Sequence, residues 1–112
     1  MLKKMLEEKR RYVRLREKIK VTYACIEEPA VNRETFTEDI SEQGIQILVS
    51  DKLIPQENID LKLEFGYDVI PIIALGKVAY FKTYHGRNRA GLEFVNMDDF
   101  QKQRMERNLG RV

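Results

Sequence analysis

Two alternating segments and the tight turn between them decide the fold of this chain. They read Thr35-Phe-Thr-Glu-Asp-Ile40, Ser41-Glu-Gln-Gly44 and Ile45-Gln-Ile-Leu-Val49. Apolar residues at every second position are typical of a strand with one buried face. Serine at the first position and glycine at the last favour a tight turn. The stretch therefore predicts an antiparallel hairpin, with Ile40 pointing to the core and Asp39 and Ser41 sharing the other face.

Further strand-like segments lie on both sides of this hairpin. They cover residues 19–26, 59–65, 69–84 and 89–95. In the long segment, Gly76 indicates a bulge or a close backbone approach. Residues 1–9 and 97–109 have helical spacing instead, and Asn96 is a suitable N-cap for the second helix. Several short strands with turns between them predict a small barrel or sandwich.

Length and composition indicate a single soluble globular domain. The chain has 112 residues, of which 43% are hydrophobic and 34% charged. No apolar run is long enough to span a bilayer, and the N-terminus lacks a secretory segment. Cys25 is the only cysteine, so no disulfide can form within the chain. We therefore expect a cytoplasmic protein with a reduced thiol.

The positive charge is concentrated at the N-terminus. Residues 1–20 carry nine basic and three acidic side chains, whereas residues 21–112 carry eleven basic and fifteen acidic ones. The densest part is Lys9-Arg-Arg-Tyr-Val-Arg-Leu-Arg16. An arginine fork can grip a phosphate or the O6 and N7 acceptors of guanine. The segment indicates an anionic ligand, although a solvated basic tail paired with nearby glutamates would have the same composition.

Two motifs in this order resemble those of a known family. Arg10-x-x-x-Arg14 precedes the first strand, and Asp39-x-Ser41-x-x-Gly44 lies between the second and third. Together they resemble the RxxxR and D/NxSxxG motifs of PilZ domains, the bacterial receptors for cyclic di-GMP. The late segments 76–81 and 89–94 are similar to the paired last strands of that family, and the resemblance covers residues 9–109.

The resemblance implies the architecture in more detail. We expect a mainly β fold, in which a six-stranded antiparallel barrel of the PilZ-like, split-barrel type carries a C-terminal helix at residues 97–109. Residues 1–8 would form a short helical arm, and residues 9–112 the barrel domain.

The resemblance also implies cyclic di-GMP as the ligand, with no other cofactor. On the N-terminal side, Arg10 and Arg14 would grip guanine and phosphate. Arg11 and Lys9 would add positive charge against the phosphates.

The second motif would supply the other half of the site. By resemblance, Asp39 and Ser41 would contact a second guanine and its sugar, and Gly44 would let the base approach.

No pattern predicts a catalytic or metal site. His85 is the only histidine, so it cannot form a zinc site with Cys25 alone, and Ser41 has no obvious base. We therefore expect no enzyme, but a receptor or adapter that changes conformation on binding cyclic di-GMP and acts through a protein effector. It would regulate bacterial motility, polysaccharide or attachment.

Two alternatives stay open. The first is a PilZ-fold interaction module that does not use the nucleotide. The second is a small barrel that binds nucleic acid through its basic arm, which the acidic body disfavours. We expect no nucleic acid polymer as partner and no membrane insertion. The oligomeric state is not determined by the sequence.

Overall fold

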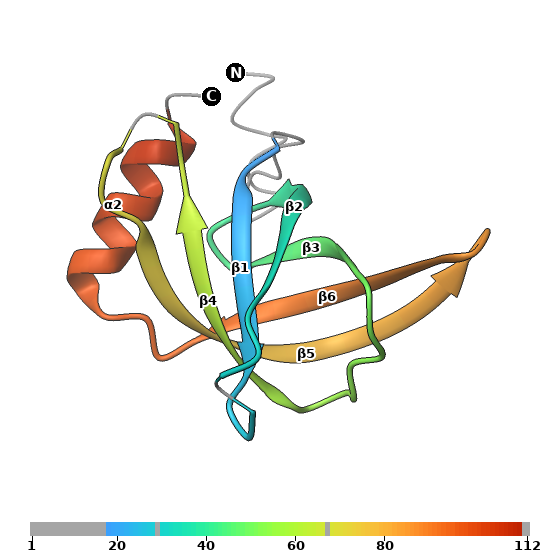
Figure 1. Ribbon diagram of the computed structural model, residues 1–112. Helices are drawn as coiled ribbons and strands as arrows, with labels where there is room; N and C mark the ends of the chain where they lie inside the picture. The colour runs from blue at the N-terminus through green and yellow to red at the C-terminus, as the bar shows by residue number, and fades with distance from the viewer. Residues whose placement is uncertain (1–17, 29, 67, 111–112) are drawn as a thin grey trace, which may run out of the picture.

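In the part of the chain that the structure describes, six strands form a closed barrel and one helix packs beside it (Figure 1). This computed structural model describes residues 18–28, 30–66 and 68–110. The elements are β1 (Lys20–Cys25), β2 (Arg33–Ile40), β3 (Gly44–Val49), β4 (Asn58–Glu64), β5 (Ile72–Tyr84), β6 (Arg87–Val95) and α2 (Asp99–Leu109). Around the barrel the order is β1-β2-β3-β6-β5-β4, and every neighbouring pair is antiparallel. The expected mainly β barrel with a C-terminal helix is confirmed, while the expected arm at residues 1–8 lies outside the described residues.

The alternating side chains of the strands fill the barrel. In β4, for example, exposed and buried positions alternate from Asn58 to Leu63. The largest side chains with at most 2% exposure include Ile40, Ile47, Ile59, Leu61, Leu63 and Ile72. Full burial of one such side chain contributes about 1.5–3 kcal/mol, so the inward row of each strand fixes its register.

The expected hairpin is formed by β2 and β3. Ile40 is fully buried and pairs with Ile45, and the Ser41 amide donates to the Gly44 carbonyl at 2.9 Å. A register shift lies between Thr37 and Asp39. A bulge of this kind bends a strand and re-aims the side chains beyond it.

The long segment after β4 is one strand, β5. Its irregularity lies between Val78 and Tyr80, not at Gly76. Gly76 is instead a position of close approach, because a Cβ there would stand 2.7 Å from Cδ1 of Leu61. The following turn consists of His85 and Gly86 alone, so β6 begins two residues earlier than the predicted start at residue 89.

Helix α2 begins at Asp99, because Asp98 caps it. The Asp98 carboxylate accepts from the Gln101 amide at 2.8 Å. The expectation that Asn96 would be the cap is wrong, since Asn96 lies in the left-handed region with φ 52°. None of the described helical residues form a segment long and apolar enough to cross a membrane.

A buried arginine fastens α2 to the loop between β4 and β5. Arg104 is only 5% exposed, and its guanidinium donates to Asp68 Oδ2 at 2.8 Å and to the Pro71 carbonyl at 3.1 Å. It also donates to the Ile70 carbonyl. These bonds hold the helix in place beside the barrel, where its other residues help to line a hollow.

Candidate functional site

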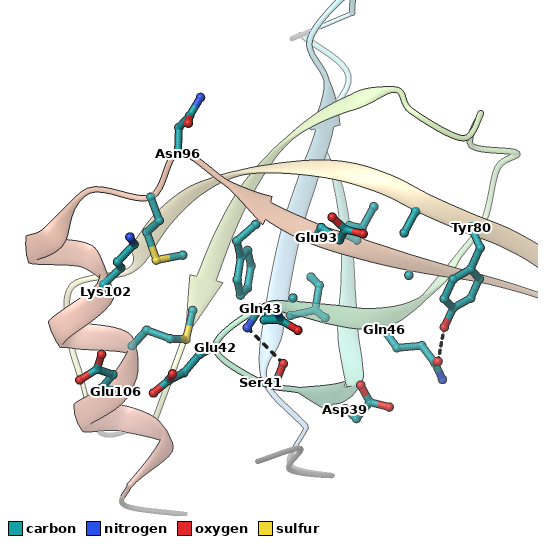
Figure 2. Close-up of a pocket in the computed structure, with 18 residues that line it drawn as sticks. Asp39, Ser41, Glu42, Gln43, Gln46, Tyr80, Glu93, Asn96, Lys102 and Glu106 are labelled. Atoms are coloured by element: carbon teal, nitrogen blue, oxygen red, sulfur yellow. Dashed lines mark hydrogen bonds between the residues drawn. The ribbon is translucent and has the colours of Figure 1, made fainter. Parts of the chain in front are cut away.

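A hollow of about 890 Å³ lies where α2 faces the barrel (Figure 2). Its wall is built from the end of β2, the β2–β3 turn, β3, β5, β6 and α2. Its volume is within the range of small-molecule sites, which is about 300–1,000 Å³. All three residues of the second predicted motif, Asp39, Ser41 and Gly44, line this hollow.

Asp39 and Ser41 lie at the same end of the hollow (Figure 2). Ser41 is 7% exposed, and its hydroxyl oxygen accepts from the Gln43 amide at 3.2 Å. The hydroxyl proton takes no part in that bond. Ser41 therefore shapes the turn and still has a donor for a ligand oxygen.

Gly44 is required by the packing of β3 on β6. A Cβ at this position would stand 2.0 Å from the carbonyl oxygen of Leu92 and 3.2 Å from Cα of Glu93. No side chain fits between the two backbones at these distances. The structure thus gives a packing reason for this glycine, and the idea that it makes room for a base stays a prediction.

The floor of the hollow contains residues that the sequence motifs did not indicate. The ring of Tyr80 lies on Gly91, its partner in β6, because a Cβ on Gly91 would stand 2.2 Å from Cε2 of the ring. The Tyr80 hydroxyl donates to Oε1 of Gln46 on β3 (Figure 2). Gln46 follows Gly44 at the strand spacing of two, but Tyr80 and Gly91 are linked only through the β5–β6 register.

An ion pair beside this floor holds Gln46 in place. Gln46 donates to Glu38 at 3.2 Å, and Arg89 pairs with the same carboxylate, with Nη2 at 3.1 Å from Oε2. The hydrogen bond from Arg89 is the main cause that lowers the pKa of Glu38 below its ordinary value. Glu38 is therefore a carboxylate at neutral pH and accepts both bonds.

The described wall of the hollow is acidic. Its charged members are four carboxylates and one ammonium group: Asp39, Glu42, Glu93, Glu106 and Lys102. Figure 2 shows Glu106 and Lys102 on α2, with Glu42 on the turn that faces them. An anionic ligand would therefore need positive charge from outside this set.

The predicted basic residues of the site are not placed by the structure. Arg10, Arg14, Arg11 and Lys9 all lie outside the described residues. The structure thus brings together one half of the predicted site, and the position of the other half stays a prediction.

Cys25 lies elsewhere, beside a small hollow of about 100 Å³. Burial, followed by the hydrogen bond and charge of Glu57, raises the pKa of the Cys25 thiol to about 11. At neutral pH this group is a thiol and a poor nucleophile. Within the described part of the chain, no group of histidine, cysteine and carboxylate residues could hold a metal ion.

Several solved bacterial structures have a similar fold, and three of them illustrate the likeness. The inhibitor of motility MotI/DgrA of Bacillus subtilis is 19% identical at a TM-score of 0.74, over 91% of this chain and 50% of that one. The PilZ domain of YcgR from Escherichia coli, solved with c-di-GMP, is 14% identical at a TM-score of 0.68. The match covers 88% of this chain and 86% of that one. The PilZ domain of CeSA from a cellulose-synthesizing bacterium is 17% identical at a TM-score of 0.66. The match covers 88% of this chain and 97% of that one. This chain thus spans half the length of the MotI/DgrA chain.

A comparison with family profiles extends this likeness to the sequence. No curated protein sequence matches this chain significantly. The profile of the PilZ domain, however, matches residues 8–111, which include both motifs and every strand. The chain belongs to the PilZ domain family.

Proposed function

We propose that this chain is a cyclic di-GMP receptor that acts as an adapter and not as an enzyme. The observation that carries the proposal is that Asp39 and Ser41 meet in a hollow of about 890 Å³. The family supports it, because the PilZ domain of YcgR was solved with c-di-GMP. Both residues belong to the D-x-S-x-x-G motif.

The chemistry of guanine suits the described half of the site. A carboxylate such as Asp39 accepts from the N1 and N2 donors of a guanine edge, as carboxylates accept from base amino groups elsewhere. The Ser41 hydroxyl, only 7% exposed, donates to a sugar or phosphate oxygen. Tyr80 and Gln46 form the floor against which the ligand lies.

Charge explains why the basic segment belongs to the same site. Cyclic di-GMP carries one negative charge on each phosphodiester, and the described wall has four carboxylates against one ammonium group. The N-terminal residues 1–20 carry nine basic and three acidic side chains. Arg10 and Arg14 grip guanine and phosphate, while Arg11 and Lys9 balance the remaining charge.

Ligand capture by this segment gives the signal. When the segment closes over Asp39 and Ser41, the surface near the hollow changes, and a protein effector that prefers the closed form binds. In a bacterial cytoplasm such an adapter regulates motility, polysaccharide synthesis or attachment. Among the similar folds, MotI/DgrA is named an inhibitor of motility, and the CeSA domain comes from a cellulose-synthesizing bacterium.

Calorimetric titration of the purified chain with cyclic di-GMP tests the proposal, with GTP and cyclic di-AMP as controls. We expect selective binding, weakened about 5- to 150-fold by Arg10→Ala or Arg14→Ala, since a bidentate arginine contact gives about 1–3 kcal/mol. Asp39→Ala should also weaken binding. Lys18→Ala removes an equal charge from an exposed position outside the motif and is the matched control.

Two results would contradict the receptor. One is the absence of heat and of any change in melting temperature with cyclic di-GMP. The other is unchanged affinity in both arginine variants. The first result would favour the second candidate, an interaction module that does not use the nucleotide, which the acidity of the described wall would then explain. The second result would show that the nucleotide is held without the arginine motif.

A further inference from the structure

The β5–β6 hairpin projects from the barrel as a two-stranded ribbon (Figure 1). Six consecutive residues at its end, 82–87, are exposed. The proposed nucleotide site uses only the base of this ribbon, where Tyr80 and Gly91 form the floor of the hollow. The outer part has no role in the barrel core.

The ribbon is held in one shape by its ladder and its turn. Pairing continues to Tyr84 and Arg87, which leaves a two-residue loop. Both loop residues, His85 and Gly86, have positive φ, at 51° and 74°. This is the type I′ geometry that matches the twist of the flanking strands. The ribbon therefore presents its side chains in a fixed pattern, with little entropy to lose on binding.

One face of the ribbon is basic and aromatic. Residues directly opposite each other in an antiparallel pair point to the same side. The pairs Tyr80–Gly91, Lys82–Arg89 and Tyr84–Arg87 therefore share a face. We call this set (Tyr80, Lys82, Tyr84, Arg87 and Arg89) the ribbon face. Thr83 and Asn88 lie on the other side, where the Thr83 hydroxyl donates to Asn88 at 2.8 Å.

The ribbon face has positive charge to spare. Arg89 is neutralised by Glu38, but neither Lys82 nor Arg87 forms an ion pair with any carboxylate in the described ranges. Residues 82–89 contain no acidic side chain, while the rest of residues 21–112 carry eight basic and fifteen acidic ones. A positive ribbon thus extends from a negative body.

We propose that the ribbon face is a docking surface for an acidic segment of a partner protein. Tyrosine and arginine are enriched in the centres of protein interfaces, and Tyr84 is 64% exposed. A broad anionic surface such as a membrane, or a nucleic acid polymer, would also meet the acidic body, whereas a short acidic segment contacts the ribbon alone. The proposal goes beyond the receptor function and holds with or without nucleotide.

Backbone amide spectra of the 15N-labelled chain test the proposal. The probe is a short synthetic peptide of alternating glutamate and valine, and its lysine–valine counterpart is the control. We expect shifts at residues 82–89 with the acidic peptide only. Lys82→Glu combined with Arg87→Glu should weaken binding about tenfold or more, because two attractions become repulsions. Lys62→Glu, an exposed charge reversal on β4, should change it little.

The location of the shifts separates the outcomes. Shifts confined to residues 1–20 would assign the peptide to the basic segment and overturn the docking surface. Equal effects of the double reversal and of Lys62→Glu would overturn it as well, as would binding to phosphatidylglycerol vesicles without binding to the peptide. Titration with cyclic di-GMP is independent of all these results, so failure of one proposal leaves the other testable.

Discussion

Replacing Arg104 by methionine should loosen the contact between α2 and the barrel. Arg104→Met keeps an unbranched stem of similar length and removes every donor of the guanidinium. Arg104 is only 5% exposed, so bulk water cannot take over the hydrogen bonds that its guanidinium makes. The bonds lost are those to Asp68, to Gln101 at 3.3 Å and to the carbonyls of Ile70 and Pro71.

The expected loss of stability follows from the carbonyls of Ile70 and Pro71, which both lose their donor. A buried acceptor that loses its donor costs about 1–3 kcal/mol. The Ile70 side chain is 63% exposed, so water can reach part of this loop and the lower values apply. We expect the free energy of unfolding to fall by roughly 2–4 kcal/mol, which lowers the melting temperature on the order of 10 °C.

The loss should also depend on pH. Hydrogen bonds from Arg104, followed by that from the Ile70 amide, hold the pKa of Asp68 below its ordinary value. A carboxylate with a depressed pKa in the folded state stabilises the protein above its unfolded pKa of about 3.9, and this contribution is lost as the pH falls through the folded value. The difference between the native chain and Arg104→Met should therefore be largest at neutral pH and shrink below about pH 4.

Urea unfolding at several pH values measures both effects. Arg107→Met is the matched control, because Arg107 lies on the same helix and is exposed, and it should change stability by less than about 0.5 kcal/mol. The reasoning is refuted if Arg104→Met is as stable as Arg107→Met at neutral pH. It is also refuted if the gap between the native chain and Arg104→Met does not change with pH.

Three further substitutions or reactions probe the site and its surroundings. Gly44→Ala should lower stability by about 1–3 kcal/mol in thermal unfolding, since its Cβ would stand 2.0 Å from a β6 carbonyl oxygen, whereas Gly66→Ala, with nothing within 4 Å, should not. Gly91→Ala should displace the Tyr80 ring and change tyrosine fluorescence with a smaller loss of stability, because a side chain can swing away; an unchanged spectrum would contradict that contact. Cys25, with a thiol pKa of about 11, should react with iodoacetamide at pH 8 far more slowly than free cysteine, and an equal rate would show that its pKa is not raised.

The fold could be predicted because alternating apolar and polar residues indicate which face of a strand is buried. The buried rows of β3 and β4, which include Ile47 and Leu63, alternate so regularly that a slip of one residue would expose them all. The ends of elements were less predictable, because single backbone angles decide them. Asn96 has the side chain of a good cap but takes a left-handed φ, and the capping bond comes from Asp98 instead.

One part of the candidate site could be predicted from the sequence, and another part could not. Asp39, Ser41 and Gly44 are close in sequence, so one motif brings them together. Tyr80 and Gly91 meet only because the ladder of β5 and β6 aligns them, and no local pattern announces that register. Sequence reasoning therefore found the turn of the site and missed its floor.

The acidic wall of the hollow indicates why an anionic ligand would need the basic N-terminal residues. Glu42, Glu93 and Glu106 come from a turn, a strand and a helix, so their common location is visible only in the folded chain. From composition alone, residues 1–20 could be an ordinary solvated tail. A net negative wall repels a dianionic nucleotide, so binding there needs cations from outside the wall. If cyclic di-GMP is the ligand, the arginine segment is then a necessary part of the site and not an aid to it, and a chain shortened to residues 18–112 should fold and yet fail to bind.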